Sequence, residues 1–83
     1  MTKFGVCICN NIEAYTIKVS NLEVFDNYDD AYSYYLEKAY RDVNILNSNV
    51  WLVFIEDNRI VQFEQLTMRI KCKIVDIDEV EKD

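Results

Sequence analysis

The first twenty residues alternate between apolar and small or polar side chains, which is the period of a β-strand. Positions 3–9 form one alternating run, positions 10–11 are a pair of asparagines that favours a tight turn, and positions 12–20 form a second run. A hairpin with this two-residue turn places Phe4 opposite Ile17. The register then gathers an apolar face made of Phe4, Val6, Ile8, Tyr15, Ile17 and Val19.

The middle of the chain changes to the spacing of an amphipathic helix. Asp26 or Asn27 can cap its first turn, and Asp29 and Asp30 follow where the helix dipole favours acids. We therefore predict a helix over positions 27–46, with Tyr32, Tyr35, Ala39 and Val43 among its buried residues. The apolar stripe consists of Tyr28, Ala31, Tyr32, Tyr35, Leu36, Ala39, Tyr40, Val43 and Leu46.

A second hairpin follows the helix. Positions 50–56 and 59–65 are strand-like and flank an Asp-Asn pair, so we expect Leu52 to lie opposite Phe63. Positions 67–77 alternate again and predict a last strand. The element order ββαβββ predicts an α+β fold: an antiparallel β-sheet of four to five strands with one helix packed on one face. Residues 1–77 would form a single domain, and residues 78–83 an acidic C-terminal tail.

The sheet face away from the predicted helix is unexpectedly apolar. A two-layer domain with one helix leaves that face in water, where polar residues are expected. An exposed apolar patch marks a surface for a partner or for self-association. The alternative is that one register is wrong, or that the last strand folds across this face and hides it. The predicted partner-binding residues on it are Trp51, Val53, Ile55 and Ile60, next to Cys7, Cys9, Ile12 and Ala14.

The charge balance is acidic, with 15 Asp and Glu against 9 Lys and Arg and a formal net charge of −6. Binding to nucleic-acid phosphates needs the opposite balance, so direct binding of DNA or RNA is not expected. The acidity suits a basic protein partner, or serves solubility alone. The acids predicted to contact a partner are Asp76, Asp78, Glu79 and Glu81, with Asp29 and Asp30 as the alternative cluster.

Residues that support catalysis are scarce. The chain has no His, so it lacks the commonest general base and any Ser-His or Cys-His pair. Its one glycine, Gly5, cannot form a glycine-rich phosphate loop. We therefore expect a protein without enzymatic activity.

The chain has three cysteines, Cys7, Cys9 and Cys72, and two interpretations of them stay open. Cys7 and Cys9 lie on the same side of one strand, where they could share a zinc ion with Cys72 as a third ligand. Alternatively, all three pack as small hydrophobic residues. The odd count does not indicate a disulfide framework, and no apolar run approaches the roughly 20 residues that span a membrane. We expect a cytoplasmic protein with reduced thiols.

In size, charge and composition the whole chain resembles the small anti-CRISPR proteins of phages and prophages in low-GC bacteria. It is short, acidic and rich in Asn, Asp, Ile, Tyr and Lys. The resemblance implies a non-catalytic inhibitor that binds a type II CRISPR effector nuclease and blocks nucleic-acid loading. It rests on no aligned motif and implies no particular site residue. The alternative function is a small homodimeric structural or adaptor protein of phage origin.

Overall fold

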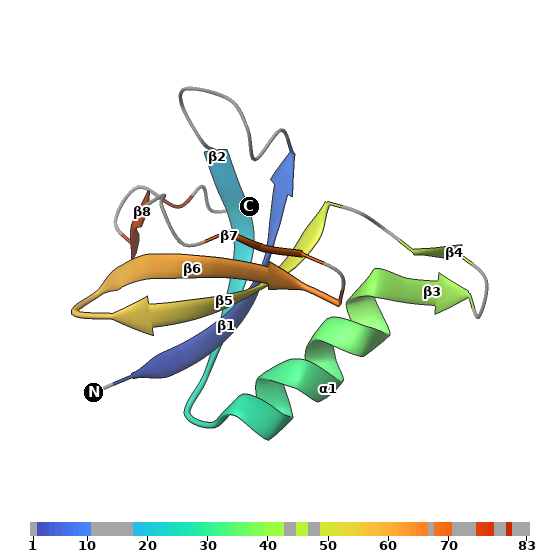
Figure 1. Ribbon diagram of the computed structural model, residues 1–83, viewed down its shortest axis with the longest axis horizontal. Helices are drawn as coiled ribbons and strands as arrows, with labels where there is room; N and C mark the ends of the chain where they lie inside the picture. The colour runs from blue at the N-terminus through green and yellow to red at the C-terminus, as the bar shows by residue number, and fades with distance from the viewer. Residues whose placement is uncertain are drawn as a thin grey trace.

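The computed structural model describes residues 2–10, 18–42, 45–46, 49–66, 68–70, 75–77 and 80. Figure 1 shows an antiparallel sheet with a helix along one face. This arrangement confirms the predicted α+β fold. In chain order the elements are β1 (Lys3–Asn10), β2 (Lys18–Phe25), α1 (Tyr28–Ala39), β3 (Tyr40–Asp42), β4 (Ile45–Leu46), β5 (Val50–Glu56), β6 (Arg59–Gln65), β7 (Met68–Ile70) and β8 (Val75–Asp76).

The main sheet has the strand order β2-β1-β5-β6-β7, and β8 also pairs with β6. Helix α1 packs on the face of β1 and β5, where its buried Ala31, Tyr35 and Ala39 contact Val6 and Leu52. Strands β3 and β4 form a separate small hairpin after the helix. Strand β5 lies at the centre of the main sheet, and all of its side chains from 50 to 53 are buried.

The first hairpin has a different register from the one predicted. Phe4 lies opposite Phe25 rather than Ile17, and Asn10 lies opposite Lys18, so a two-residue turn at 10–11 is wrong. The predicted return strand shares only positions 18–20 with β2, and its remaining residues, 12–17, lie outside the described part of the chain. The observed register carries the chain from Phe25 almost directly into α1.

A bulge in β2 changes the face on which its side chains lie. The pairing shifts between Val6 and Ile8, and Asn21 has a φ of 55°, a conformation that Asn tolerates better than most residues. Beyond this bulge the alternation is reversed. Val19 therefore packs on the face opposite the helix, where it is 1% exposed, and its predicted place on the helix side is wrong.

A second bulge lies in the β5–β6 hairpin. The turn at Asp57 and Asn58 forms as predicted, and both residues have positive φ. After the turn the register shifts, so that Phe63 lies opposite Val53 and the predicted pair of Leu52 with Phe63 does not form. The slip turns Phe63 away from the helix.

Helix α1 is shorter than the predicted 27–46 segment. Asn27 is its N-cap, and the Asn27 side chain accepts a hydrogen bond of 2.9 Å from the Asp30 backbone N–H. The helix ends at Ala39 because Tyr40 leaves the helical conformation (φ −111°, ψ 81°) and begins β3. Tyr35 and Ala39 are buried as predicted, Tyr32 is half-buried, and Val43 lies outside the described residues.

The predicted last strand is present at both of its ends. Residues 68–70 form β7 and pair with the end of β6, and residues 75–76 form β8 and pair with the start of β6. Both ends of the predicted strand therefore pair with β6. Residues 71–74, which include Cys72, lie outside the described part.

Gly5 allows a close approach between neighbouring strands. A β-carbon at this position would lie 2.9 Å from Leu22 Cδ1, 3.0 Å from the Glu23 carbonyl oxygen and 3.1 Å from Val53 Cγ2. Two of these contacts involve the neighbouring strand β2, beside its bulge. The glycine therefore permits the bulged strand to pack tightly against β1.

We expect Gly5→Ala to lower the free energy of unfolding by about 1–3 kcal/mol, the usual cost of overpacking. A glycine-to-alanine change without steric conflict would instead stabilise the protein by roughly 0.4–1 kcal/mol. The sign of the change in unfolding free energy therefore shows whether position 5 is tightly packed. Urea unfolding gives this value. Ser33→Ala, on the exposed side of α1, is the control and should stay within about 0.5 kcal/mol. Equal or greater stability of Gly5→Ala would contradict the tight packing.

Candidate functional site

The apolar face predicted to bind a partner lies inside the protein. Trp51 is 3% exposed, Val53 0%, Ile55 6% and Ile60 0%. These side chains form one buried cluster with Cys7, Cys9, Val19 and Phe63. The prediction that they are exposed is wrong, and they offer no surface to a second protein in this conformation.

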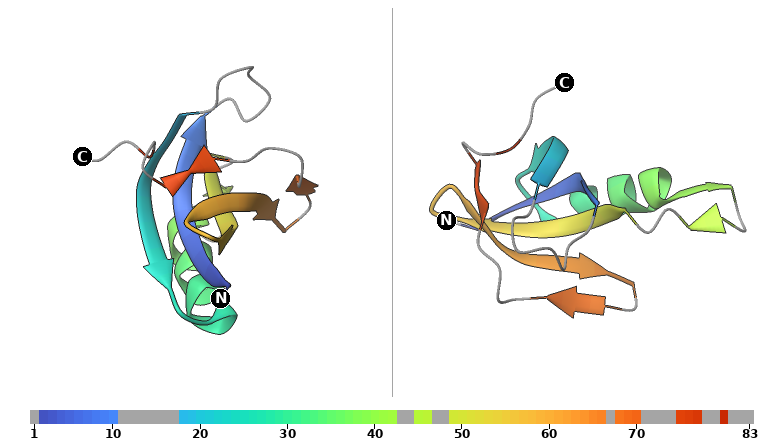
Figure 2. Two further views of the ribbon diagram at one scale, coloured as in Figure 1. Left: turned by 90° about the vertical axis from the view of Figure 1, so that its left-hand side faces the viewer. Right: turned by 90° about the horizontal axis from the view of Figure 1, so that it is seen from above.

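Two features cover this face. The bulges direct Val19 and Phe63 onto it, and Phe63 packs edge-on against Trp51 with ring centroids 6.2 Å apart. Ile77 and Val80, which follow β8, also pack against the cluster. The Ile77 backbone N–H donates to the Asn58 carbonyl at 3.0 Å and fixes this crossing. The burial of the cluster shows that the alternative of a covered face is correct, and Figure 2 shows the twist of the sheet that carries it.

Cys7 and Cys9 belong to this second core, and each is 1% exposed. Both lie on one face of β1, as the alternation predicted, and neither forms a disulfide bond. Within the described residues, no group of three or more Cys, His, Asp or Glu side chains could hold a metal ion. Cys72, the third predicted ligand, lies outside those residues. The zinc site therefore stays a prediction.

Burial decides the chemistry of the Cys7 thiol. Desolvation, and to a smaller extent the neighbouring Cys9, raises the pKa of Cys7 far above its ordinary value of 9.0. A zinc ligand is a thiolate, so a zinc ion here would have to displace the proton of this buried thiol. Since the folded pKa is raised, the contribution of Cys7 to stability is complete below pH 9 and declines as pH rises above it.

Acidic side chains gather at one end of the sheet. This end carries the start of β1, the end of β2, the β5–β6 turn, β8 and the first turn of α1. One exposed ion pair, between Lys3 and Asp26 at 3.8 Å, lies among them. We call this region the acidic end, and its described acids are Asp26, Asp29, Asp30, Glu56, Asp57 and Asp76, beside the bases Lys3 and Arg59.

The acidic end contains described members of both acidic clusters predicted from the sequence. Asp76 is half-buried in β8 and lies opposite Arg59, while Asp29 and Asp30 are exposed in the first turn of α1. The other predicted contact acids, Asp78, Glu79 and Glu81, lie outside the described residues. The structure thus brings one member of the tail cluster to the same end as the helix cluster.

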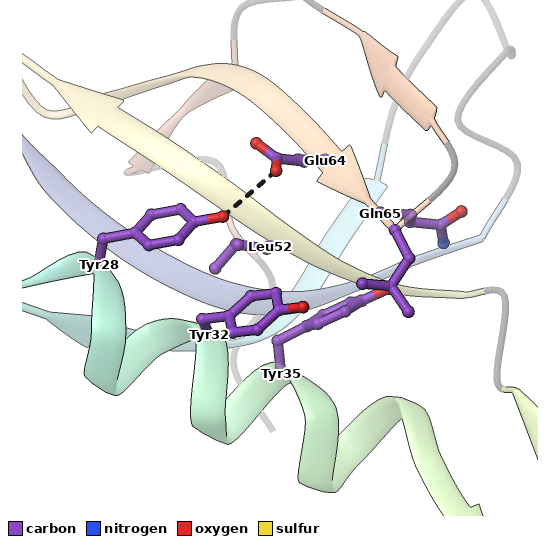
Figure 3. A pocket seen from close by; sticks show the side chains of 7 residues that line it. Tyr28, Tyr32, Tyr35, Leu52, Glu64 and Gln65 are labelled. Carbon is purple, nitrogen blue, oxygen red and sulfur yellow. Dashed lines mark hydrogen bonds between the residues drawn. The ribbon is translucent and has the colours of Figure 1, made fainter.

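A pocket of about 240 Å³ lies between α1 and the C-terminal end of β6. Three tyrosines from successive turns of the helix form one wall, and Figure 3 shows them reaching toward the sheet. The rings of Tyr28 and Tyr32 stack with centroids 5.8 Å apart, and those of Tyr32 and Tyr35 with centroids 6.4 Å apart. We call this the tyrosine pocket; its lining is completed by Leu52, Glu64, Gln65 and Leu66.

The polar groups of the tyrosine pocket are held in place by hydrogen bonds. The Tyr28 hydroxyl donates to Glu64 Oε1 at 3.3 Å, and Gln62 Nε2 donates to Glu64 Oε2 at 3.3 Å. Gln65 Nε2 donates to the Val50 carbonyl at 3.1 Å. The described lining of the pocket therefore presents a positioned carboxylate beside aromatic rings.

Tyr35 is the least satisfied group of the pocket. It is 1% exposed, and its hydroxyl makes no hydrogen bond of full geometry among the described residues, although the Leu66 backbone N–H lies close enough to act on it. Burial raises the pKa of Tyr35; the nearby Leu66 backbone N–H opposes this shift, while Tyr40, Tyr32 and Glu64 add to it. The hydroxyl stays neutral and can both donate and accept a hydrogen bond.

Sequence reasoning missed the tyrosine pocket. The spacing of Tyr28, Tyr32 and Tyr35 placed them on one face of the helix, but they were assigned to packing. Glu64 joins them only because of the bulge in β6, which places it opposite Leu52 on the helix side. In the predicted register Glu64 faced the other way, so no sequence signal could have united the four residues.

Comparison with known proteins adds no name to this site. The chain matches no protein-family model, and the searches of curated proteins and of solved structures find no significant match. Within the described part of the chain, no helix is both long and apolar enough to cross a membrane.

We expect Cys7 and Cys9 to be protected from a thiol reagent such as DTNB at pH 8. In the native protein at most one of the three cysteines, Cys72, should react, whereas all three should react in denaturant. A chelator should change neither result, because burial rather than metal protects the thiols. Release of zinc by the chelator, together with new reactivity, would instead establish the metal site.

Proposed function

We propose that this protein is a non-catalytic inhibitor that binds a basic, nucleic-acid-handling protein through its acidic end. The partner class, a type II CRISPR effector nuclease, comes from the resemblance in size, charge and composition. Such a nuclease holds nucleic acid in positively charged channels. A small acidic domain can occupy the entrance of such a channel and block nucleic-acid loading.

The observation that carries this proposal is the charge at the acidic end. Four parts of the chain supply six described acids to this end, against two bases. None of the described charged side chains is buried, so these acids act on the solvent side. Charges of this kind steer the encounter with a basic surface and raise the association rate.

The alternative, a homodimeric adaptor, rested on an exposed Trp51 face. That face is buried by Phe63, Ile77 and Val80, and it no longer supplies a contact between two copies. No other described observation favours the adaptor over the inhibitor.

The proposal predicts that target-DNA cleavage by a susceptible type II effector nuclease falls as the protein is added. The double variant Asp26→Lys/Glu56→Lys should bind the nuclease about tenfold more slowly at low salt, because it reverses charge at the acidic end. The difference should shrink at high salt, where such charges are screened. Stopped-flow association and a cleavage assay at two salt concentrations measure both effects.

The matched control is Glu23→Lys/Glu37→Lys. It changes the net charge by the same amount, at exposed positions in the middle of β2 and in the second half of α1. Its association rate should stay within about twofold of the wild-type rate, since the effect depends on position and not on total charge. Equal slowing by the two double variants would contradict a role for the acidic end. Full activity of a panel of type II nucleases would contradict the proposed partner.

A further inference from the structure

We propose that four aromatic residues, at the start of α1 and on the strands that face it, form the surface that anchors the basic partner. The surface receives an apolar side chain of the partner that is flanked by Lys or Arg. We call it the aromatic patch; its residues are Phe4, Tyr28, Tyr32 and Phe54. This inference deepens the proposed function and rests on it for the partner, whereas the anchoring contact follows from the packing and exposure of the four rings.

The rings come from three elements and form one connected group. Tyr28, the first residue of α1, lies edge-on to Phe4 of β1 with centroids 5.6 Å apart, and tilted against Phe54 of β5 at 5.9 Å. Phe4 and Phe54 are opposite each other in the sheet, and their rings meet edge-on at 5.3 Å. Tyr32 stacks on Tyr28 at 5.8 Å. Each ring is therefore held in place by at least one neighbour.

The aromatic patch lies at the rim of the first core. All four of its residues are half-buried, whereas the helix residues at the centre of that core, Ala31, Tyr35 and Ala39, are at most 1% exposed. A ring that is already packed on one side loses little conformational freedom when a partner covers its other side. Aromatic side chains are accordingly enriched in the central part of protein interfaces and contribute most of the binding energy there.

Acids border the aromatic patch. Glu56 follows Phe54 by two residues in β5 and so lies on the same face of the sheet. Its carboxylate accepts a hydrogen bond of 3.1 Å from the Thr2 hydroxyl. Asp29, which follows Tyr28 in the first turn of α1, is exposed. The patch is therefore continuous with the acidic end.

This border decides which occupant fits. The acidic end has six described acids against two bases, of which Lys3 pairs with Asp26 at 3.8 Å and Arg59 lies opposite Glu56. A second copy of the chain would bring the same acids against this border, and the phosphates of a nucleic acid would be repelled in the same way. A protein surface with an apolar side chain between Lys or Arg residues gains both attractions.

Peptide titration followed by two-dimensional NMR of the isotope-labelled protein tests the surface without any nuclease. The probe is the tripeptide Lys-Leu-Lys, acetylated and amidated at its ends. We expect saturable shifts at the amides of Asp29, Tyr32 and Phe54 in the millimolar range, which is the strength of a single side-chain contact. Lys-Ser-Lys should bind about fivefold more weakly, because it lacks the apolar side chain. Glu-Leu-Glu should cause no saturable shifts, because its charges are repelled.

A pair of tyrosine variants tests the anchor against the nuclease itself. Tyr32→Ala removes one ring of the aromatic patch and should raise the dissociation rate about tenfold, with little change in the association rate. The matched control Tyr34→Ala removes a half-buried tyrosine from the other flank of α1, where its ring packs on Phe25 with centroids 5.2 Å apart. Its dissociation rate should stay within about twofold of the wild-type rate. Melting temperatures of both variants show whether each stays folded.

The proposal is overturned if Lys-Ser-Lys or Glu-Leu-Glu binds as tightly as Lys-Leu-Lys. It is equally overturned if the shifts centre on Phe25 and Tyr34, or are absent at tens of millimolar peptide. These titrations use the wild-type protein, so they decide the matter even where a variant fails to fold.

Failure of this inference is distinct from failure of the proposed function. Inhibition of a nuclease with equal dissociation rates for Tyr32→Ala and Tyr34→Ala would keep the function and remove the aromatic patch as its anchor. Binding of Lys-Leu-Lys at the patch without inhibition of any type II nuclease would keep the surface and exclude the nuclease as its partner.

Discussion

The structure depends on a central strand that is buried on both faces. Strand β5 lies between β1 and β6, and its side chains alternate between two cores. Leu52 faces the helix, whereas Trp51 and Val53 face the C-terminal crossing. An antiparallel sheet with one helix covers only one face. The second face must therefore be covered by the chain itself, and the two bulges, Gly5 and the segment around Ile77 all serve that requirement.

Closing both faces determines where recognition can occur. The described core holds no charged or polar residue, so the described charges lie on the outside, and six of the described acids lie at one end of the sheet. The helix covers β1 and β5 but leaves the flank of β6, where the tyrosine pocket forms. Exposed acids at one end of the sheet are placed where, in the proposed function, they would steer the encounter with a basic partner, because charge acts on the association rate.

Local signals predicted much of the fold. The cap at Asn27, the burial of Tyr35 and Ala39, and the turn after Glu56 each follow from a few neighbouring residues. The errors arose at the two bulges, because an extra residue interrupts the two-residue alternation from which the faces were predicted. Val19 and Phe63 therefore lie on the sheet face opposite the predicted one, and Glu64 lies on the helix side, where it lines the pocket. The unbroken apolar run from Val50 to Ile55 was the missed signal, because strands buried on both faces lose their alternation. The site could not be predicted, since it combines a helix face with a residue whose orientation depends on a bulge.

The most direct test of this account is acrylamide quenching of Trp51, the one tryptophan in the chain. Trp51 is 3% exposed in a single molecule, so the native monomer should show blue-shifted emission and weak quenching, both independent of protein concentration. Unfolding in denaturant should restore full quenching. Strong quenching of the native monomer, or protection that appears only as the protein associates at higher concentration, would show that the second face is open and would contradict the account.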